Sequence, residues 1–222
     1  MCGRFVIKSD LQQIQLAFNV TQVHAQVQPS YNIAPTQPVA TIVQREHQIA
    51  LEAMRWGLIP AWAKDASIGA KMINARAEGI AEKPSFKRPL KSKRCLIVAD
   101  GFYEWKKERA RKIPMFIRLK SEAPFAFAGL YDVWQSAPDK TITSCAIITT
   151  RPNELMQTIH TRMPVILPKS AYSSWLDPAN QNLAELIALL EPYPADAMLA
   201  YPVSMLVNSP RNNSPECIQP VQ

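Results

Sequence analysis

No two cysteines in this sequence lie close enough to form a CxxC pair, because Cys2, Cys95, Cys145 and Cys217 are far apart. This excludes the common zinc and dithiol redox motifs. The sequence also lacks a G-x-S-x-G serine elbow, a glycine-rich phosphate loop and a metal-spaced cluster of ligands. We therefore expect neither a metal ion nor a cofactor.

Long apolar runs are absent too. No stretch approaches the ~20 residues that a membrane-spanning helix needs. Arg4, Lys8 and Asp10 interrupt the N-terminal region where a signal peptide would have its apolar segment. We expect a soluble cytoplasmic protein, associated with the nucleoid if it is bacterial, that does not bind membranes. Disulfide bonds are not expected in a reducing compartment, and Cys95 and Cys145 lie in apolar runs typical of a core.

The composition is that of an ordinary globular protein with an excess of positive charge. The 222 residues are 47% hydrophobic, and 25 Lys and Arg against 18 Asp and Glu give a net charge of +7. This charge favours a polyanionic partner but does not identify one, since many basic proteins bind nothing acidic.

Strand patterns outnumber helix patterns and do not alternate regularly with them, which predicts an α+β fold with mixed or antiparallel sheets. We expect one domain over residues 1–222, with a core over 2–207 and a surface tail over 208–222. A capping box from Ser9 to Gln12 predicts a helix, and residues 57–72 predict a loop that exposes Trp56 and Trp62. Further helices are predicted at 152–157, near Glu78, at 170–176 and at 183–190, and strands at 3–7, 39–44, 49–56, 95–99, 102–107, 115–119, 125–131, 142–149 and 163–167.

The first candidate site is the start of the chain. If Met1 is removed, Cys2 carries an α-amine and a thiol on adjacent carbons, and together they can close a thiazolidine ring on an aldehyde. The amine has a reference pKa of about 8, so a useful fraction is neutral near pH 7.5. Gly3 allows a ligand to approach the backbone closely, and Arg4 could hold a phosphate. The alternative is that Cys2 is merely a small residue after the initiator.

Two further stretches place polar groups inside apolar patterns. Asn74 and Arg76 would face the same side of a strand, where they could bind a sugar oxygen and a phosphate; a turn-forming Asn beside a solvated Arg is the alternative. Glu104 lies between aromatic residues, and burial would raise its pKa into the range useful for acid–base catalysis. The alternative is a surface glutamate paired with Lys106 or Lys107.

A third stretch contains His160 and Arg162, directly before an apolar segment. Histidine transfers protons readily near pH 7, although a single histidine is often structural.

Six motifs in chain order resemble the SOS-response-associated peptidase (SRAP) family. They are Met1-Cys-Gly-Arg-Phe5, Tyr31-Asn-Ile-Ala-Pro35, Arg55-Trp-Gly-Leu-Ile-Pro60, Ile73-Asn-Ala-Arg76, Asp100-Gly-Phe-Tyr-Glu-Trp105 and Ile159-His-Thr-Arg-Met-Pro164, and Tyr201-Pro-Val-Ser204 also fits.

This resemblance implies a single α+β domain with barrel-like sheets, flanking helices and a basic cleft for single-stranded DNA. It also implies that the processed Cys2 crosslinks to the aldehyde of an abasic site and shields the lesion during the DNA damage response. By resemblance, Cys2 is the nucleophile, Asn74 contacts the opened sugar, and Glu104 and His160 are the acid–base groups. The implied DNA-binding residues are Arg4, Asn32, Trp62, Arg76, Thr149 and Arg162. Relatives carry two adjacent tryptophans where this chain has Trp62-Ala63, so base stacking is expected to be weaker.

Two other functions stay open from the sequence. One is a cysteine-type peptidase that removes Met1, although an aminopeptidase could do the same. The other is a non-catalytic reader of single-stranded or modified DNA. An imine intermediate would also permit weak lyase activity. The expected partner is single-stranded DNA containing abasic sites, and we expect a monomer.

Overall fold

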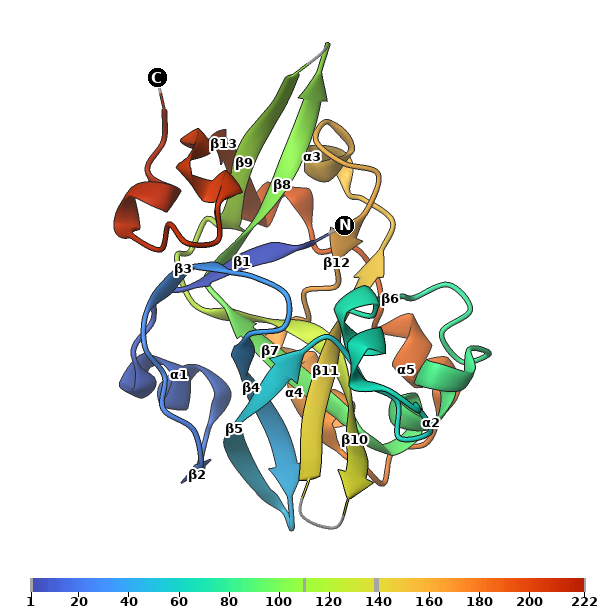
Figure 1. The fold of residues 1–222 in the computed structure, drawn as a ribbon. Coiled ribbons are helices and arrows are strands. Elements are labelled where there is room, and N and C mark those ends of the chain that lie inside the picture. The colour runs from blue at the N-terminus through green and yellow to red at the C-terminus, as the bar shows by residue number, and fades with distance from the viewer. Residues whose placement is uncertain (1, 110, 138–139, 222) are drawn as a thin grey trace.

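A computed structural model describes residues 2–109, 111–137 and 140–221. Met1 and Gln222, the ends of the predicted domain, lie outside the described residues. The chain folds as an α+β structure, as predicted, with its β-sheets in the centre and short helices around them (Figure 1). The helices are α1 (Leu11–Phe18), α2 (Pro84–Ser92), α3 (Glu154–Gln157), α4 (Tyr172–Leu176) and α5 (Leu183–Ala188), with 3-10 turns η1 (Ala66–Lys71), η2 (Lys169–Ala171), η3 (Ala195–Ala197), η4 (Met205–Asn208) and η5 (Pro215–Ile218).

Two sheets organise the described residues. The strands are β1 (Arg4–Ile7), β2 (Gln22–Val23), β3 (Ser30–Ile33), β4 (Pro38–Arg45), β5 (Gln48–Trp56), β6 (Asn74–Arg76), β7 (Arg94–Ala99), β8 (Gly101–Glu108), β9 (Arg111–Leu119), β10 (Phe125–Ala137), β11 (Lys140–Thr150), β12 (Met163–Pro164) and β13 (Met198–Pro202). One sheet has the order β13-β9-β8-β1-β3, and the other has the order β12-β11-β10-β7-β4-β5-β2.

The second sheet closes on itself. Parallel pairing of β11 with β5, at Ser144–Arg55 and Cys145–Trp56, joins the two ends of the series β11-β10-β7-β4-β5. These strands therefore form a closed barrel, which leaves few exposed strand edges. Every residue of β7 is buried, as a strand inside such a core requires.

β1 connects the open sheet to the barrel. The Phe5 ring packs edge-on against Trp56 at 5.1 Å and against Phe127 at 5.8 Å between ring centroids. Trp56, which the sequence pattern placed in an exposed loop, is fully buried, and its indole N–H donates to the carbonyl of Ile73 at 2.9 Å. That prediction was wrong because the pattern around Trp56 does not reveal that β5 pairs with β11.

Several local predictions are confirmed and others shift. The β4–β5 hairpin turns at Glu46 and His47, both with positive φ, which suits a two-residue hairpin loop. Residues 77–83 form bends and turns instead of the expected short helix, and the basic residues after them form α2, with Pro84 in its first turn. The strand predicted over 163–167 is reduced to Met163–Pro164, with Ile166 bridging Phe127.

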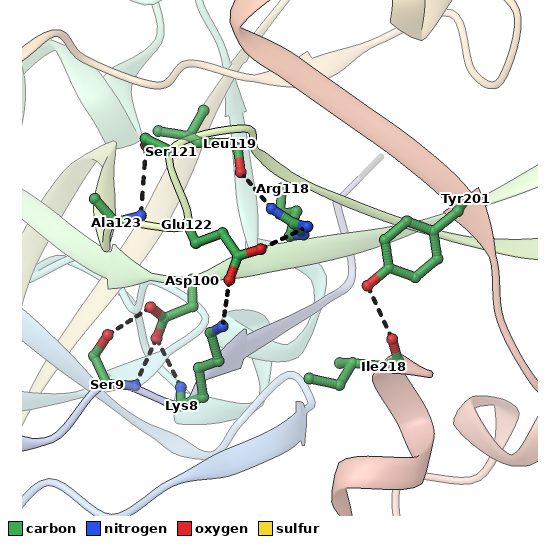
Figure 2. A network of polar contacts seen from close by, with 10 residues as sticks. All are labelled: Lys8, Ser9, Asp100, Arg118, Leu119, Ser121, Glu122, Ala123, Tyr201 and Ile218. Carbon is green, nitrogen blue, oxygen red and sulfur yellow. Dashed lines mark hydrogen bonds and ion pairs between the residues drawn. The ribbon is translucent and has the colours of Figure 1, made fainter. Parts of the chain in front are cut away.

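The capping box of α1 lies one residue later than predicted. The Asp10 carboxylate accepts from Gln13 N at 2.8 Å, and Gln13 Oε1 accepts from Asp10 N at 2.9 Å. Ser9 is unavailable as a cap because its hydroxyl donates to the Asp100 carboxylate at 2.6 Å, and the amides of Lys8 and Ser9 donate to the same group (Figure 2). Asp100 thus fixes the junction between β1 and α1 from the β7–β8 corner.

The C-terminal segment, predicted as a surface tail, is held to the body of the protein. Tyr201 donates its hydroxyl proton to the carbonyl of Ile218 at 2.9 Å (Figure 2), Val203 bridges Pro220, and Cys217 is fully buried. All four cysteines are buried free thiols. Within the described chain, no helix combines the length and apolar character needed to cross a membrane.

Candidate active site

The first described residue of the chain, Cys2, lies inside the protein. β1 pairs with β8 in the register Arg4–Tyr103 and Phe5–Phe102, so Cys2 and Gly3 extend alongside the segment of β8 that carries Glu104. The Cys2 side chain has 0% exposure and belongs to the main core cluster. Its thiol donates to the Arg4 carbonyl across 3.9 Å. In Figure 1, β1 runs through the centre of the molecule beside β8.

Asn74 holds this segment from the other sheet. β6 pairs in parallel with β11, with Asn74 opposite Ile147, and the Asn74 amide donates from Nδ2 to the Cys2 carbonyl at 2.9 Å. Its Oδ1 atom is buried and accepts no hydrogen bond from the described residues. An unsatisfied buried acceptor costs about 1–3 kcal/mol, which is expected where a ligand supplies the missing donor.

Glu104 lies in β8 with 3% exposure. Burial raises the pKa of its carboxyl, and the nearby imidazole of His160 opposes that rise only in part. The interpretation of Glu104 as a surface glutamate paired with a lysine is therefore wrong. Burial also raises the pKa of the Cys2 thiol, and the negative charge of Glu104 raises it further. The three groups thus share one electrostatic environment.

His160 is positioned by α3. The Asn153 side chain caps this helix by accepting from Met156 N at 2.8 Å, and the His160 amide donates to the Met156 carbonyl at 2.8 Å. His160 Nδ1 lies 3.0 Å from the amide nitrogen of Arg162 and 3.3 Å from the Arg162 carbonyl oxygen, so the turn at Arg162 fixes the orientation of the ring.

Arg162, directly before β12, and Arg76, in β6, lie on neighbouring segments beside this group. Arg162 donates to the Thr149 carbonyl at 2.6 Å and pairs with Glu78 at 2.7 Å. Thr149 is fully buried and opposite Arg76 in the β11–β6 register, while the Arg76 side chain is exposed. Thr149 therefore supports Arg162 through its main chain, and Arg76 is open to solvent.

Arg4 and Asn32 contact the C-terminal segment in this structure. Arg4 donates to Asn32 Oδ1 at 2.7 Å and to the Val207 carbonyl at 2.9 Å. Asn32 has 1% exposure, and its Nδ2 donates to the carbonyls of Val207, Ser209 and Asn212. A contact between Asn32 and DNA would require this segment to move, so the DNA-binding role of both residues stays a prediction.

Trp62 is presented at the surface by a braced loop. Its side chain is 59% exposed. The preceding residue, Ala61, donates its amide to Asp132 Oδ2 at 2.8 Å, and Lys93 pairs with Asp132 Oδ1 at 2.5 Å. The Trp134 indole donates to the carbonyl after Trp62 at 2.7 Å. Sequence reasoning missed Asp132, although a carboxylate within the apolar β10 pattern is the same signal that identified Glu104.

The arrangement brings together a thiol, a carboxyl, an imidazole and an amide, with two guanidinium groups beside them. Across the described parts of the chain, no three His, Cys, Asp or Glu side chains form a group that could hold a metal ion. The chemistry available to this set is nucleophilic attack with proton transfer.

Comparisons with known proteins place this geometry in context. Residues 1–210 match the sequence model described as SOS response associated peptidase (SRAP). The abasic site processing protein YoqW of Bacillus subtilis is 54% identical over 222 residues, with 99% of each chain covered. The abasic site processing protein HMCES of Xenopus tropicalis is 34% identical, over 86% of this chain and 66% of its own. A crystal structure of a Bacteroides thetaiotaomicron protein superposes with a TM-score of 0.89 at 30% identity, covering 100% of both chains.

Proposed function

Because the chain belongs to the SOS response associated peptidase (SRAP) family, we propose that it processes abasic sites in DNA by forming a covalent bond to them. The relatives named as abasic site processing proteins, at up to 54% identity over the whole chain, support the general role. The proposed chemistry is a thiazolidine crosslink between Cys2, after removal of Met1, and the ring-opened sugar. Such a crosslink would shield the lesion during the DNA damage response.

The reaction proceeds in two stages with the loss of one water. The neutral α-amine of Cys2 attacks the C1′ aldehyde and gives a carbinolamine. The protonated carboxyl of Glu104 donates its proton to the departing hydroxyl, which leaves as water, and an iminium ion remains. The Glu104 carboxylate then takes the proton of the Cys2 thiol, and the thiolate adds to the iminium carbon to close the ring. The carboxyl is thereby ready as an acid for the reverse reaction.

The observation that carries this proposal is the position of Cys2 among groups suited to these steps. Burial raises the pKa of Glu104, which favours the protonated acid that the first stage needs. Burial raises the pKa of the Cys2 thiol as well, so the second stage needs a local base. Asn74 holds the Cys2 carbonyl and keeps Oδ1 available, where it would accept a hydrogen bond from a hydroxyl group of the opened sugar. His160 would stabilise the carboxylate between the stages.

Holding the DNA in place accounts for capture of a scarce aldehyde. Arg76 and Arg162 lie on adjacent segments and would bind the flanking phosphates, and Trp62 would stack on a neighbouring base. Orientation of this kind replaces a high concentration of the reactive aldehyde. Unpaired DNA is required because the sugar must leave the base stack to reach a terminus this deeply placed.

The test is a denaturing gel of Met1-processed protein mixed with an oligonucleotide that contains one abasic site. A slow, heat-stable band is expected, with a mass equal to protein plus DNA minus one water. Cys2→Ala keeps the amine but lacks the thiol, so it should give a band only when borohydride traps the imine. Cys145→Ala, which removes another fully buried thiol, should crosslink like the wild type. An undiminished stable band in Cys2→Ala would overturn the proposal.

Two alternatives give distinct results. Self-removal of Met1 predicts a mature N-terminus even when the protein is translated without any aminopeptidase, and mass spectrometry of that product decides it. A non-catalytic DNA reader predicts salt-dependent binding of abasic DNA with no covalent band in any variant.

A further inference from the structure

The outer edge of β9 is paired with a neighbouring strand along its second half only, so the first residues of β9 have no strand beside them on that edge. β13 pairs with β9 from Met115 to Leu119, and the amide of Val203 donates to the Pro114 carbonyl at 3.0 Å. The chain then turns away into η4. Beside residues 111–113 of β9, the described chain places a hollow of about 1150 Å³ where the next strand would lie. We name this hollow the edge groove; its walls include Arg111, Lys112, Ile113, Val203, Met205 and Val221.

The edge groove lies away from the candidate active site, at the end of the hairpin of β8 and β9. In Figure 1 this hairpin extends beyond the rest of the molecule, and the C-terminal segment lies beside β9. Neither Cys2 nor Asn74 lines the groove. A ligand bound there would therefore leave the proposed crosslinking site free.

Aliphatic side chains form one part of this groove. Met205 is 60% exposed, and Val221 is also exposed, beside the buried Val203. Neighbouring apolar side chains left in water favour a partner that covers them, and methionine adapts its shape to varied partners.

Positive charge forms the other part. Arg111 and Lys112 line the groove, and Lys107 lies directly opposite Lys112 in the β8–β9 register. Glu108 is the single acidic residue among the described residues of the lining. The net charge around the groove therefore complements an acidic partner.

The backbone of β9 also offers hydrogen bonds at this edge. Main-chain groups alternate in direction along an antiparallel strand, two residues apart pointing to the same side. Because the Pro114 carbonyl points toward β13, the N–H and C=O of Lys112 point to the same side. An extended chain in the groove could pair with them, as in strand addition to a sheet edge.

We propose that the edge groove binds an acidic, extended peptide segment of a partner protein, whose apolar side chains cover Met205 and Val221 while its carboxylates face Arg111 and Lys112. A peptide fits these features better than single-stranded DNA does. Unpaired bases bind chiefly by stacking on aromatic rings, and among the described residues that line the groove none is aromatic.

The experiment measures fluorescence anisotropy of a labelled peptide of about ten residues, which alternates Asp with Leu and spans about 33 Å when extended. The full-length protein is titrated against this peptide and against a matched peptide with Lys in place of Asp. We expect saturable binding of the acidic peptide only, weakened when salt rises from ~50 to ~300 mM. The double variant Arg111→Glu/Lys112→Glu should weaken binding about tenfold or more, and Met205→Glu should weaken it as well.

The matched control is the double variant Arg88→Glu/Lys91→Glu, which makes the same charge change on the exposed side of α2. It should bind the peptide within about twofold of the wild type. Equal losses in Arg88→Glu/Lys91→Glu would show non-specific charge attraction and would overturn the proposal. So would the absence of saturable binding, or a double variant that loses affinity for undamaged single-stranded DNA while the peptide binds unchanged. Melting curves of each variant separate a binding defect from unfolding.

Discussion

Glu104→Gln should slow the proposed crosslink and, at the same time, stabilise the fold at neutral and alkaline pH. Glutamine has nearly the same shape as glutamate but neither donates nor accepts a catalytic proton. Glu104 is 3% exposed and burial raises its pKa, so the ionised carboxylate is disfavoured where it lies. The same environment that prepares the acid therefore costs stability once the group ionises.

The size of the rate effect follows from the proton transfers assigned to the carboxyl. Loss of a general acid–base group typically slows a reaction by 10²- to 10⁴-fold, or about 3–5 kcal/mol of barrier. The pH profile of crosslinking should also change. The wild type should lose rate as the pH rises through the pKa of Glu104, whereas the residual rate of Glu104→Gln should not respond to that ionisation.

The sign of the stability effect follows from the raised pKa. A carboxyl whose pKa is higher in the folded than in the unfolded state binds its proton more tightly when folded. Its contribution is fully present below the unfolded value of about 4.3 and is lost as the pH rises through the folded value. Each unit of the shift corresponds to about 1.4 kcal/mol, or roughly 3–5 °C in Tm for a chain of this size.

Thermal melts of both proteins between pH 4 and pH 9, a range of roughly five units around these values, check the prediction. The difference in Tm should be small at the acidic end and should grow in favour of Glu104→Gln as the pH rises. Glu108→Gln, an exposed change on the same strand, should show neither the rate loss nor the pH-dependent gain. A crosslinking rate within about threefold of wild type, or a Glu104→Gln protein less stable at high pH, would refute the reasoning.

Three further substitutions test how the site is supported. Asn32→Ala leaves three carbonyls of the C-terminal segment, one buried and two part-buried, without their donor. It should lower the free energy of unfolding in urea by about 2–4 kcal/mol; a loss below ~1 kcal/mol would contradict this role. Gly101→Ala would place a Cβ atom 2.3 Å from the Phe116 ring and should lower the free energy of unfolding by about 1–3 kcal/mol. Adding Phe116→Leu to the same chain should restore part of that stability. Asp132→Asn removes an acceptor charge that braces the Trp62 loop. It should weaken binding of single-stranded DNA by about 2- to 10-fold, and combination with Trp62→Ala should add little in a double-mutant cycle.

Local patterns were sufficient to identify much of the sheet and the main site candidates. The hairpin at residues 45–47 and most strands follow from alternating apolar residues and turn positions, which depend on neighbours in sequence. The burial of Glu104 followed from its place between aromatic residues, and that of Cys95 and Cys145 from their apolar runs. In each of these cases a few adjacent residues carry the information.

Pairing between distant segments was not predictable in this way. Closure of the barrel depends on parallel pairing of β11 with β5, and the sequence of neither strand indicates which strand it pairs with. Arg4 and Asn32 both contact a segment about two hundred residues later, which no local pattern indicates; their contact with DNA stays a prediction. The shift of the capping box to Asp10 likewise depends on Asp100, which accepts the hydrogen bond of the Ser9 hydroxyl from the corner between β7 and β8.

The order of the motifs was enough to indicate the family and the chemical types of the groups, because side-chain chemistry is a property of each residue. Whether those groups act together is a matter of distance and solvation, which arise only when the two sheets pack. Packing buries Cys2 and Glu104 in one environment, brings Asn74 from β6 to the Cys2 carbonyl, and moves the pKa values of the thiol and the carboxyl upward.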